Sequence, residues 1–178
     1  KNTSCKGTQK RKCEKKWAVS CMAKNEGKKF EEDFKNSVPA TAYIYKLKDA
    51  GGWSNATNTR FTVNNICDYI MYSKPTMYLL ELKSFKGKSL PYSNIKKNQT
   101  KGLLDASEYA GIRAGIVANF RELNETYYID IRELAKFKKS SNRKSYPLDL
   151  FREKGQLIEQ EKKVTRYKYD IEKFIKGE

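Results

Sequence analysis

The sequence predicts an α/β domain with a central mixed β-sheet flanked by helices and a protruding stalk or loop segment. Several short segments are rich in β-branched and aromatic residues, as strands are, and longer segments have helical apolar spacing. Along the chain they follow the order strand, strand, helix, strand, strand, which is typical of a mixed α/β core. A length of 178 residues suits one such domain with its own hydrophobic core.

The chain begins with a strongly basic stretch. Residues 1–24 contain eight Lys and Arg against one acid, Glu14. Such a run predicts a basic arm that becomes ordered on nucleic acid. Cys5, Cys13 and Cys21 recur in it without the tight pairs of zinc or iron–sulfur sites, so we favour free thiols over a shared metal site. Residues 25–178 are expected to form a single domain.

The first helix is expected to follow Asn25, a residue suited to capping a helix. Phe30 and Phe34 are four residues apart and predict the buried stripe of this helix. It should end near Ser37, because Pro39 cannot continue it.

A strand is expected over residues 41–48, and a long polar segment follows it. Residues 51–65 are rich in Gly, Asn and Thr, and a connection of this length in a compact domain is usually functional or disordered. Trp53 and Arg60 within it are suited to contacting bases and phosphates. We therefore expect a stalk that contacts DNA, with a mobile surface loop as the alternative.

Two strands are expected over residues 66–72 and 77–83, joined by a turn at Ser73–Thr76. If these four residues form a hairpin loop, Tyr72 faces Met77. Two more strands are expected over 115–120 and 126–131, and helices over 94–110 and 132–140. From Leu148 onward the sequence is mixed and shows neither a clear helical pattern nor a clear strand pattern.

This hairpin register brings three ionisable side chains together. Counting inward from the turn places Asp68 opposite Glu81, and directly paired residues share a face with Cβ atoms about 5 Å apart. Lys83 lies two residues beyond Glu81 and points the same way. The neighbouring residues of both strands are almost all apolar.

Two facing carboxylates beside an apolar sheet repel each other and lose hydration. A divalent cation removes both penalties, and Mg²⁺ favours one or two carboxylates together with water and phosphate oxygens. Lys83 could then orient or activate a water for attack on phosphorus. The alternative is an ordinary charge pair between Glu81 and Lys83 on an edge strand, with Asp68 merely starting a strand.

The charge of the chain favours a polyanionic partner. The formal net charge is +16, with 37 Lys and Arg against 21 Asp and Glu. Nucleic acid explains such an excess better than a membrane surface, because no basic amphipathic helix with a clean apolar face is evident. A lysine-rich solvated surface is the remaining alternative. We expect an intracellular (cytoplasmic) protein with no membrane contact, since no segment is apolar enough to span a bilayer.

The chain contains no histidine. This excludes serine–histidine and cysteine–histidine triads, HExxH zinc sites and histidine-based nuclease sites within one chain. Hydrolysis must therefore depend on carboxylates, lysine, tyrosine, cysteine or a metal ion.

Asp68, followed after twelve residues by Glu81-Leu82-Lys83, resembles the PD-(D/E)xK motif of the restriction-endonuclease-like nucleases, with Cys67 where that motif has proline. Residues 25–33 are similar to the first helix of RecU-type Holliday junction resolvases. The lysine-rich run over 83–92 and Gln99 continue the likeness, which covers about residues 25–131.

The resemblance implies a bacterial or phage-encoded homodimer that binds four-way DNA junctions and nicks them with Mg²⁺ or Mn²⁺ in recombination and repair. It implies that Asp68 and Glu81 are metal ligands, that Lys83 orients water, and that Glu31, or its neighbour Glu32, adds an outer ligand. Gln99 is expected to position a phosphate or the water, or to be an ordinary surface residue. Expected DNA contacts are Trp53, Arg60, Lys86, Lys88, Lys96, Lys97 and Lys101.

Two other functions remain open on the sequence. One is another DNA nuclease of the same fold, such as a restriction or mismatch endonuclease or an exonuclease, although the missing tight cysteine pairs argue against the iron–sulfur exonucleases. The other is a non-catalytic protein that binds nucleic acid through its basic faces alone.

Overall fold

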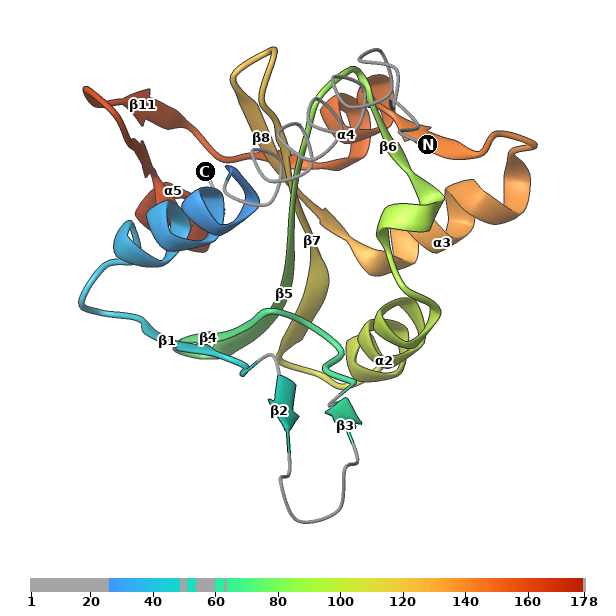
Figure 1. Ribbon diagram of the computed structural model, residues 1–178, viewed down its shortest axis with the longest axis horizontal. Helices are drawn as coiled ribbons and strands as arrows, with labels where there is room; N and C mark the ends of the chain where they lie inside the picture. Colours follow the sequence, from blue (N-terminus) through green and yellow to red (C-terminus); the bar gives the residue numbers. More distant parts are fainter. Residues whose placement is uncertain (1–25, 49–50, 54–59, 63, 178) are drawn as a thin grey trace, which may run out of the picture.

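A six-stranded sheet forms the centre of the molecule (Figure 1). The computed structural model describes residues 26–48, 51–53, 60–62 and 64–177. In spatial order the strands of the sheet are β1 (Tyr43–Lys46), β4 (Tyr69–Ser73), β5 (Thr76–Phe85), β7 (Ile112–Phe120), β8 (Glu125–Asp130) and β10 (Gln156–Leu157). The β5–β7 pair is parallel and its neighbours are antiparallel, so the sheet is mixed, as predicted.

Helices cover both faces of this sheet. They are the helix over residues 26–36, α2 (Lys97–Ser107), α3 (Ile131–Ser140), α4 (Leu148–Lys154) and α5 (Ile171–Lys176). Phe30, Phe34 and Phe174 bury the first helix and α5 against one face. Leu103 and Leu134 bury α2 and α3 against the other, which we call the α2 face. The predicted flanking helices are therefore confirmed.

The alternation of side chains along β5 decides which residues meet α2. Leu80 and Leu82 belong to the apolar cluster under the helix over 26–36, whereas Leu79 belongs to the cluster under α2. Because side chains alternate between the faces of a strand, Glu81 and Lys83 point to the α2 face.

The β4–β5 hairpin has the predicted register, with Tyr72 opposite Met77. Its loop is shorter than expected: Ser73 still pairs with Thr76, which leaves Lys74 and Pro75 as the connection. The register is unaffected, because a four-residue loop and this two-residue connection place the same residues of the two strands opposite one another.

The helix predicted over 94–110 begins later than expected. A 3₁₀ turn, η1 (Tyr92–Asn94), comes first, and α2 starts at Lys97. The tail that showed no single pattern folds into α4, β10, the hairpin of β11 (Gln160–Lys162) and β12 (Tyr167–Tyr169), and α5. A further small sheet pairs β6 (Ser89–Pro91) with β9 (Ser145–Pro147). No helix in the described part of the chain could span a membrane.

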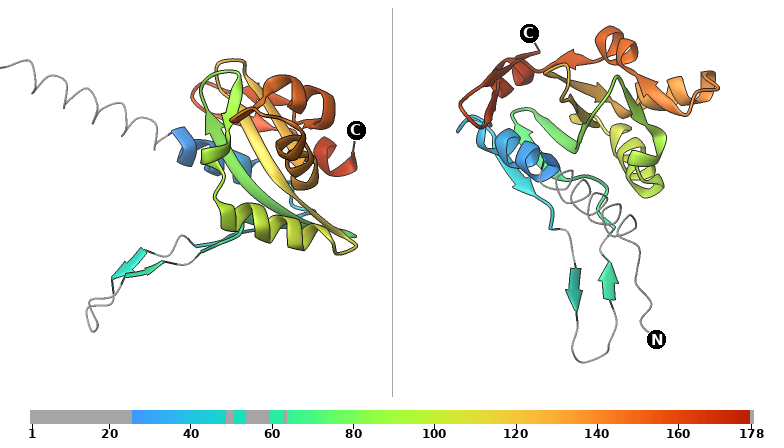
Figure 2. Two further views of the ribbon diagram at one scale, coloured as in Figure 1. Left: turned by 90° about the vertical axis from the view of Figure 1, so that its right-hand side faces the viewer. Right: turned by 45° about the horizontal axis from the view of Figure 1, so that its top comes forward.

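The expected stalk begins as a two-stranded ribbon. Its strands are β2 (Gly51–Trp53) and β3 (Arg60–Thr62), and Trp53 pairs with Arg60. The ribbon projects away from the main sheet in both views of Figure 2. Residues 54–59 between its strands, and the basic arm with its three cysteines, lie outside the described residues.

We predict that Gly115→Ala destabilises the protein by about 1–3 kcal/mol, the usual cost of overpacking. A Cβ at Gly115 in β7 would lie 2.3 Å from the carbonyl oxygen of Ile129 and 2.7 Å from the Tyr128 ring. Urea denaturation measures the change. Gly27→Ala is the matched control: it lies in the helix over 26–36 with no atom within 4 Å of a new Cβ, and should add roughly 0.5–1 kcal/mol. Unchanged stability of Gly115→Ala would contradict this packing.

Candidate active site

Asp68 immediately precedes β4 and lies close enough to Glu81 for its charge to act on that carboxyl. The ladder ends at Tyr69 opposite Leu80, and the Asp68 amide also donates to the Leu80 carbonyl, at 3.1 Å, so Asp68 does not continue the register to Glu81. One carboxylate oxygen of Asp68 also accepts the Leu82 amide at 2.7 Å. These bonds fix the Asp68 carboxylate against β5, beside Glu81.

The Glu81 carboxylate is fully buried and only half satisfied. Its side chain is 0% exposed, and its Oε1 atom accepts hydrogen bonds from Lys83 Nζ and, at 2.6 Å, from Gln99 Nε2. Its Oε2 atom is buried without a hydrogen-bond partner. Buried carboxylate oxygens are costly to leave unpaired, so this atom indicates a missing positive partner.

The electrostatics of the pair follow from burial. Loss of hydration, and then the neighbouring charge of Asp68, raise the pKa of Glu81 from the ordinary 4.5 to about 7. The hydrogen bonds and charge of Lys83 and the hydrogen bond of Gln99 act in the opposite direction. Cys67, the residue in the place of the motif proline, is buried, and its burial with the nearby carboxylates raises its thiol pKa to about 12. Cys67 therefore stays a protonated thiol in the metal-free protein.

Gln99 joins the first turn of α2 to Glu81. Its Oε1 atom accepts the Lys96 backbone amide at 3.0 Å and so caps the helix, while its Nε2 atom donates to Glu81. Gln99 is only 7% exposed, so the reading of it as an ordinary surface residue is wrong. Its side-chain amide bonds the Glu81 carboxylate and so holds that carboxylate in place.

The site fits a divalent cation. The Asp68 carboxylate lies near Glu81, and a buried oxygen of Glu81 has no partner. Mg²⁺ commonly takes one or two protein carboxylates and completes its shell with water and phosphate oxygens, so Asp68 and Glu81 could hold such an ion without a third protein ligand.

Glu31 stands apart from this pair. Its carboxylate forms an ion pair with Lys46 at 2.6 Å, and its helix packs on the sheet face opposite α2. Glu32, the alternative, pairs with Arg166. Among the residues described, no group of three or more Asp, Glu, Cys or His side chains could hold one ion. A metal-ligand role for Glu31 stays a prediction.

The lysines expected to contact DNA lie on the surface. Lys86, Lys88, Lys96, Lys97 and Lys101 are all exposed, the first two between β5 and β6 and the others at the start of α2. Since Gln99 from the same helix turn reaches Glu81, the α2 lysines border the carboxylate pair.

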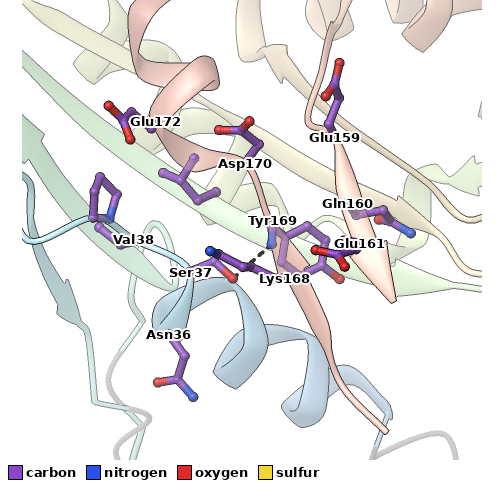
Figure 3. Close-up of a pocket in the computed structure, with 12 residues that line it drawn as sticks. Asn36, Ser37, Val38, Glu159, Gln160, Glu161, Lys168, Tyr169, Asp170 and Glu172 are labelled. Carbon is purple, nitrogen blue, oxygen red and sulfur yellow. Dashed lines mark hydrogen bonds between the residues drawn. The ribbon is translucent and has the colours of Figure 1, made fainter. Parts of the chain in front are cut away.

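A separate cavity of about 610 Å³ lies away from these residues (Figure 3). It lies between the end of the helix over 26–36 and the β11–β12 hairpin, where the Tyr169 amide donates to Ser37 Oγ at 3.0 Å. Acidic side chains line it, namely Glu159, Glu161, Asp170 and Glu172. Their charge is wrong for nucleic acid, so this cavity is not a candidate DNA site.

Helices thus flank a mixed sheet whose central strand β5 carries Glu81 and Lys83 on the α2 face, beside Asp68. The chain belongs to the family described as Recombination protein U, whose model matches residues 28–171. This confirms the likeness to RecU-type proteins. The match also extends beyond residue 131, where we expected it to end, and includes the β11–β12 hairpin.

Two further proteins are similar to the chain. One is a Bacillus subtilis (strain 168) protein described as SPbeta prophage-derived uncharacterized protein YotM, 28% identical over 167 residues, or 85% of each chain. The other is the structure of Hjc from Archaeoglobus fulgidus, described as a Holliday junction resolvase from an archaeal hyperthermophile. It has a TM-score of 0.45 and 12% identity, and the likeness covers 66% of this chain and 84% of that one.

We predict that Glu81→Gln stabilises the metal-free protein as the pH rises. The folded-state pKa of Glu81 is raised. Between about pH 4.5 and 7, Glu81 is therefore protonated in the folded protein but ionised in the unfolded chain. Wild-type stability therefore falls across this window, and the glutamine variant lacks that loss. Near pH 8 in EDTA the variant should be more stable by on the order of 1–3 kcal/mol.

Urea denaturation near pH 5 and pH 8 measures this difference. Near pH 5 most of the gain should be absent, because wild-type Glu81 is then protonated in the folded state. A gain of equal size at both pH values would show that burial of the charge is not its cause.

Proposed function

We propose that this chain is a divalent-metal-dependent endonuclease that cuts four-way DNA junctions as a homodimer, in recombination or repair. One observation carries the proposal: a fully buried carboxylate, Glu81, lies near the charge of Asp68, and one of its oxygens has no partner. Membership of the Recombination protein U family supports the choice of DNA as substrate.

Asp68 and Glu81 would hold Mg²⁺ or Mn²⁺. Such an ion supplies charge stabilisation for the phosphoryl oxygens and the leaving group. Lys83 reaches the same carboxylate and is partly exposed, so its ammonium can turn toward a water molecule and orient it toward phosphorus. Gln99 acts through Glu81, whose orientation it fixes.

The charge of the molecule suits this substrate. A formal charge of +16 favours encounter with DNA, and lysines at the start of α2 border the carboxylate pair. Contacts from Lys96, Lys97 and Lys101 to phosphates would set the position of the strand without reading its sequence. An enzyme that recognises the shape of a junction needs contacts of this kind.

We predict that Asp68→Asn abolishes cutting and leaves DNA binding within a few-fold of wild type. The substitution removes a charge needed for the ion but keeps the shape and the acceptor for the Leu82 amide. Cleavage is measured on four-way junction, linear duplex and single-stranded DNA, each with Mg²⁺, Mn²⁺ or EDTA.

Nicks that depend on the metal and are confined to the junction support the proposal. Cutting of linear duplex at the same rate would instead indicate another nuclease of this fold. Binding without cutting under any metal would indicate a non-catalytic nucleic-acid-binding protein. Asp105→Asn, at an exposed position of α2, is the matched control and should cut normally.

A further inference from the structure

The stalk leaves the domain and rejoins it beside α2 (Figure 1). Its two ends are Lys48, after β1, and Asn65, before β4, and we call these two residues the foot of the stalk. The side-chain amide of Asn65 donates to the Lys48 carbonyl at 2.8 Å. Next to this bond, the Leu47 amide donates to the Asp68 carbonyl at 2.9 Å. The two ends of the stalk are thus tied to each other where the sheet begins.

Asn98 ties the foot of the stalk to the first turn of α2. Its Nδ2 atom donates to the Asn65 carbonyl at 3.2 Å. A second contact lies one helical turn further along, where a Cβ at Gly102 would be 2.2 Å from Cγ2 of Ile66. Glycine at this position therefore lets α2 lie this close to Ile66. We call the chain of hydrogen bonds from Asn98 through Asn65 to Lys48 the asparagine clamp.

The asparagine clamp joins the two sides of the carboxylate pair. Asn65 lies three residues before Asp68, in the segment that leads into β4. Asn98 directly precedes Gln99, whose side chain donates to Glu81 at 2.6 Å. The clamp therefore fixes the segment that carries one carboxylate against the helix that orients the other. Metal affinity depends on this spacing, because one ion must reach both carboxylates at close to ideal distances.

The start of α2 needs such a tie. Its N-cap residue is Lys96, which has no side-chain oxygen to cap the helix, and its first turn contains no acidic residue. The Gln99 side chain supplies the cap by accepting the Lys96 amide. The same glutamine thus caps the helix and holds Glu81, so any movement of the first turn carries Gln99 away from the carboxylate.

We infer that Asn65 and Asn98 are positioning residues for the metal site. They hold the first turn of α2 against the foot of the stalk, and so hold Gln99 on Glu81. The inference deepens the proposed function and rests on it only for what is positioned, a metal-binding pair. The ribbon expected to contact DNA is then anchored to the helix that orients a carboxylate of the site.

The first test is hydrogen exchange of the Gln99 side-chain amide, measured by NMR on the metal-free full chain without DNA. This amide is buried and bonded in the wild type, so it should exchange slowly. Asn98→Ala should speed the exchange by roughly 3- to 10-fold, the range that loss of one hydrogen bond gives. Alanine is a better helix former than asparagine, so a faster exchange cannot be ascribed to helix propensity.

The second test is a double-mutant cycle on Mn²⁺ affinity, followed by electron paramagnetic resonance. Asn98→Ala should weaken binding by roughly 3- to 10-fold. Gln99→Ala should weaken it by about 10- to 100-fold, the usual effect of losing a residue that orients a ligand. In the Gln99→Ala background Asn98→Ala should add almost nothing, because the clamp then has no connection to Glu81. A merely structural residue would weaken binding equally in both backgrounds.

Asn36→Ala is the matched control, because Asn36 is an exposed asparagine in the helix over 26–36, which packs on the opposite face of the sheet. It should change neither measurement. Unchanged exchange of the Gln99 amide in Asn98→Ala overturns the inference, and so does an equal loss of Mn²⁺ affinity in both backgrounds. A wild type that binds no Mn²⁺ counts against the proposed nuclease, whereas faster exchange in Asn98→Ala would still support the positioning role.

Discussion

The repulsion between Asp68 and Glu81 is the constraint on which the site depends. Asp68 lies beside β5, close enough for its charge to act on Glu81, and Glu81 is fully buried there. Its raised pKa expresses the cost of that position, which Lys83 and Gln99 reduce only in part. A chain selected for stability alone would place an apolar residue at position 81, as it does at Leu79. The cost is understandable if a cation and a phosphate enter the site.

The surrounding fold holds this unfavourable pair in place. Strand β5 lies between an antiparallel and a parallel neighbour, so its backbone cannot move to separate the carboxylates. Helix α2, which connects β5 to β7 through the parallel crossover, brings Gln99 over Glu81. Among the described residues no helix covers β1 and β4 on the α2 face, and there Tyr43, Tyr45 and Tyr72 are exposed.

Local patterns predicted much of the fold and the centre of the site. The Ser73–Thr76 turn predicted the hairpin register, which is confirmed from Ser73 opposite Thr76 to Tyr69 opposite Leu80. The register does not extend to Asp68, whose amide donates to the Leu80 carbonyl, and its position near Glu81 depends on that local departure. The partners of Gln99 depend on how α2 crosses the sheet, which periodicity does not reveal. The ion pair between Glu31 and Lys46 likewise depends on tertiary packing. The exposure of Tyr43, Tyr45 and Tyr72 was not predicted, because tyrosines in a strand look alike whether a helix covers them or not. The C-terminal hairpin was missed because each of its strands has only three residues and half of these residues are charged.

Binding of Mn²⁺ to the metal-free protein, followed by electron paramagnetic resonance, tests the central claim most directly because it needs neither DNA nor turnover. The account predicts about one tightly bound ion per chain in the wild type, and a large loss of affinity in both Asp68→Asn and Glu81→Gln. The Asp105→Asn variant should bind as the wild type does. Equal Mn²⁺ affinity in all four proteins would contradict the account, because the two carboxylates would then not be the ligands.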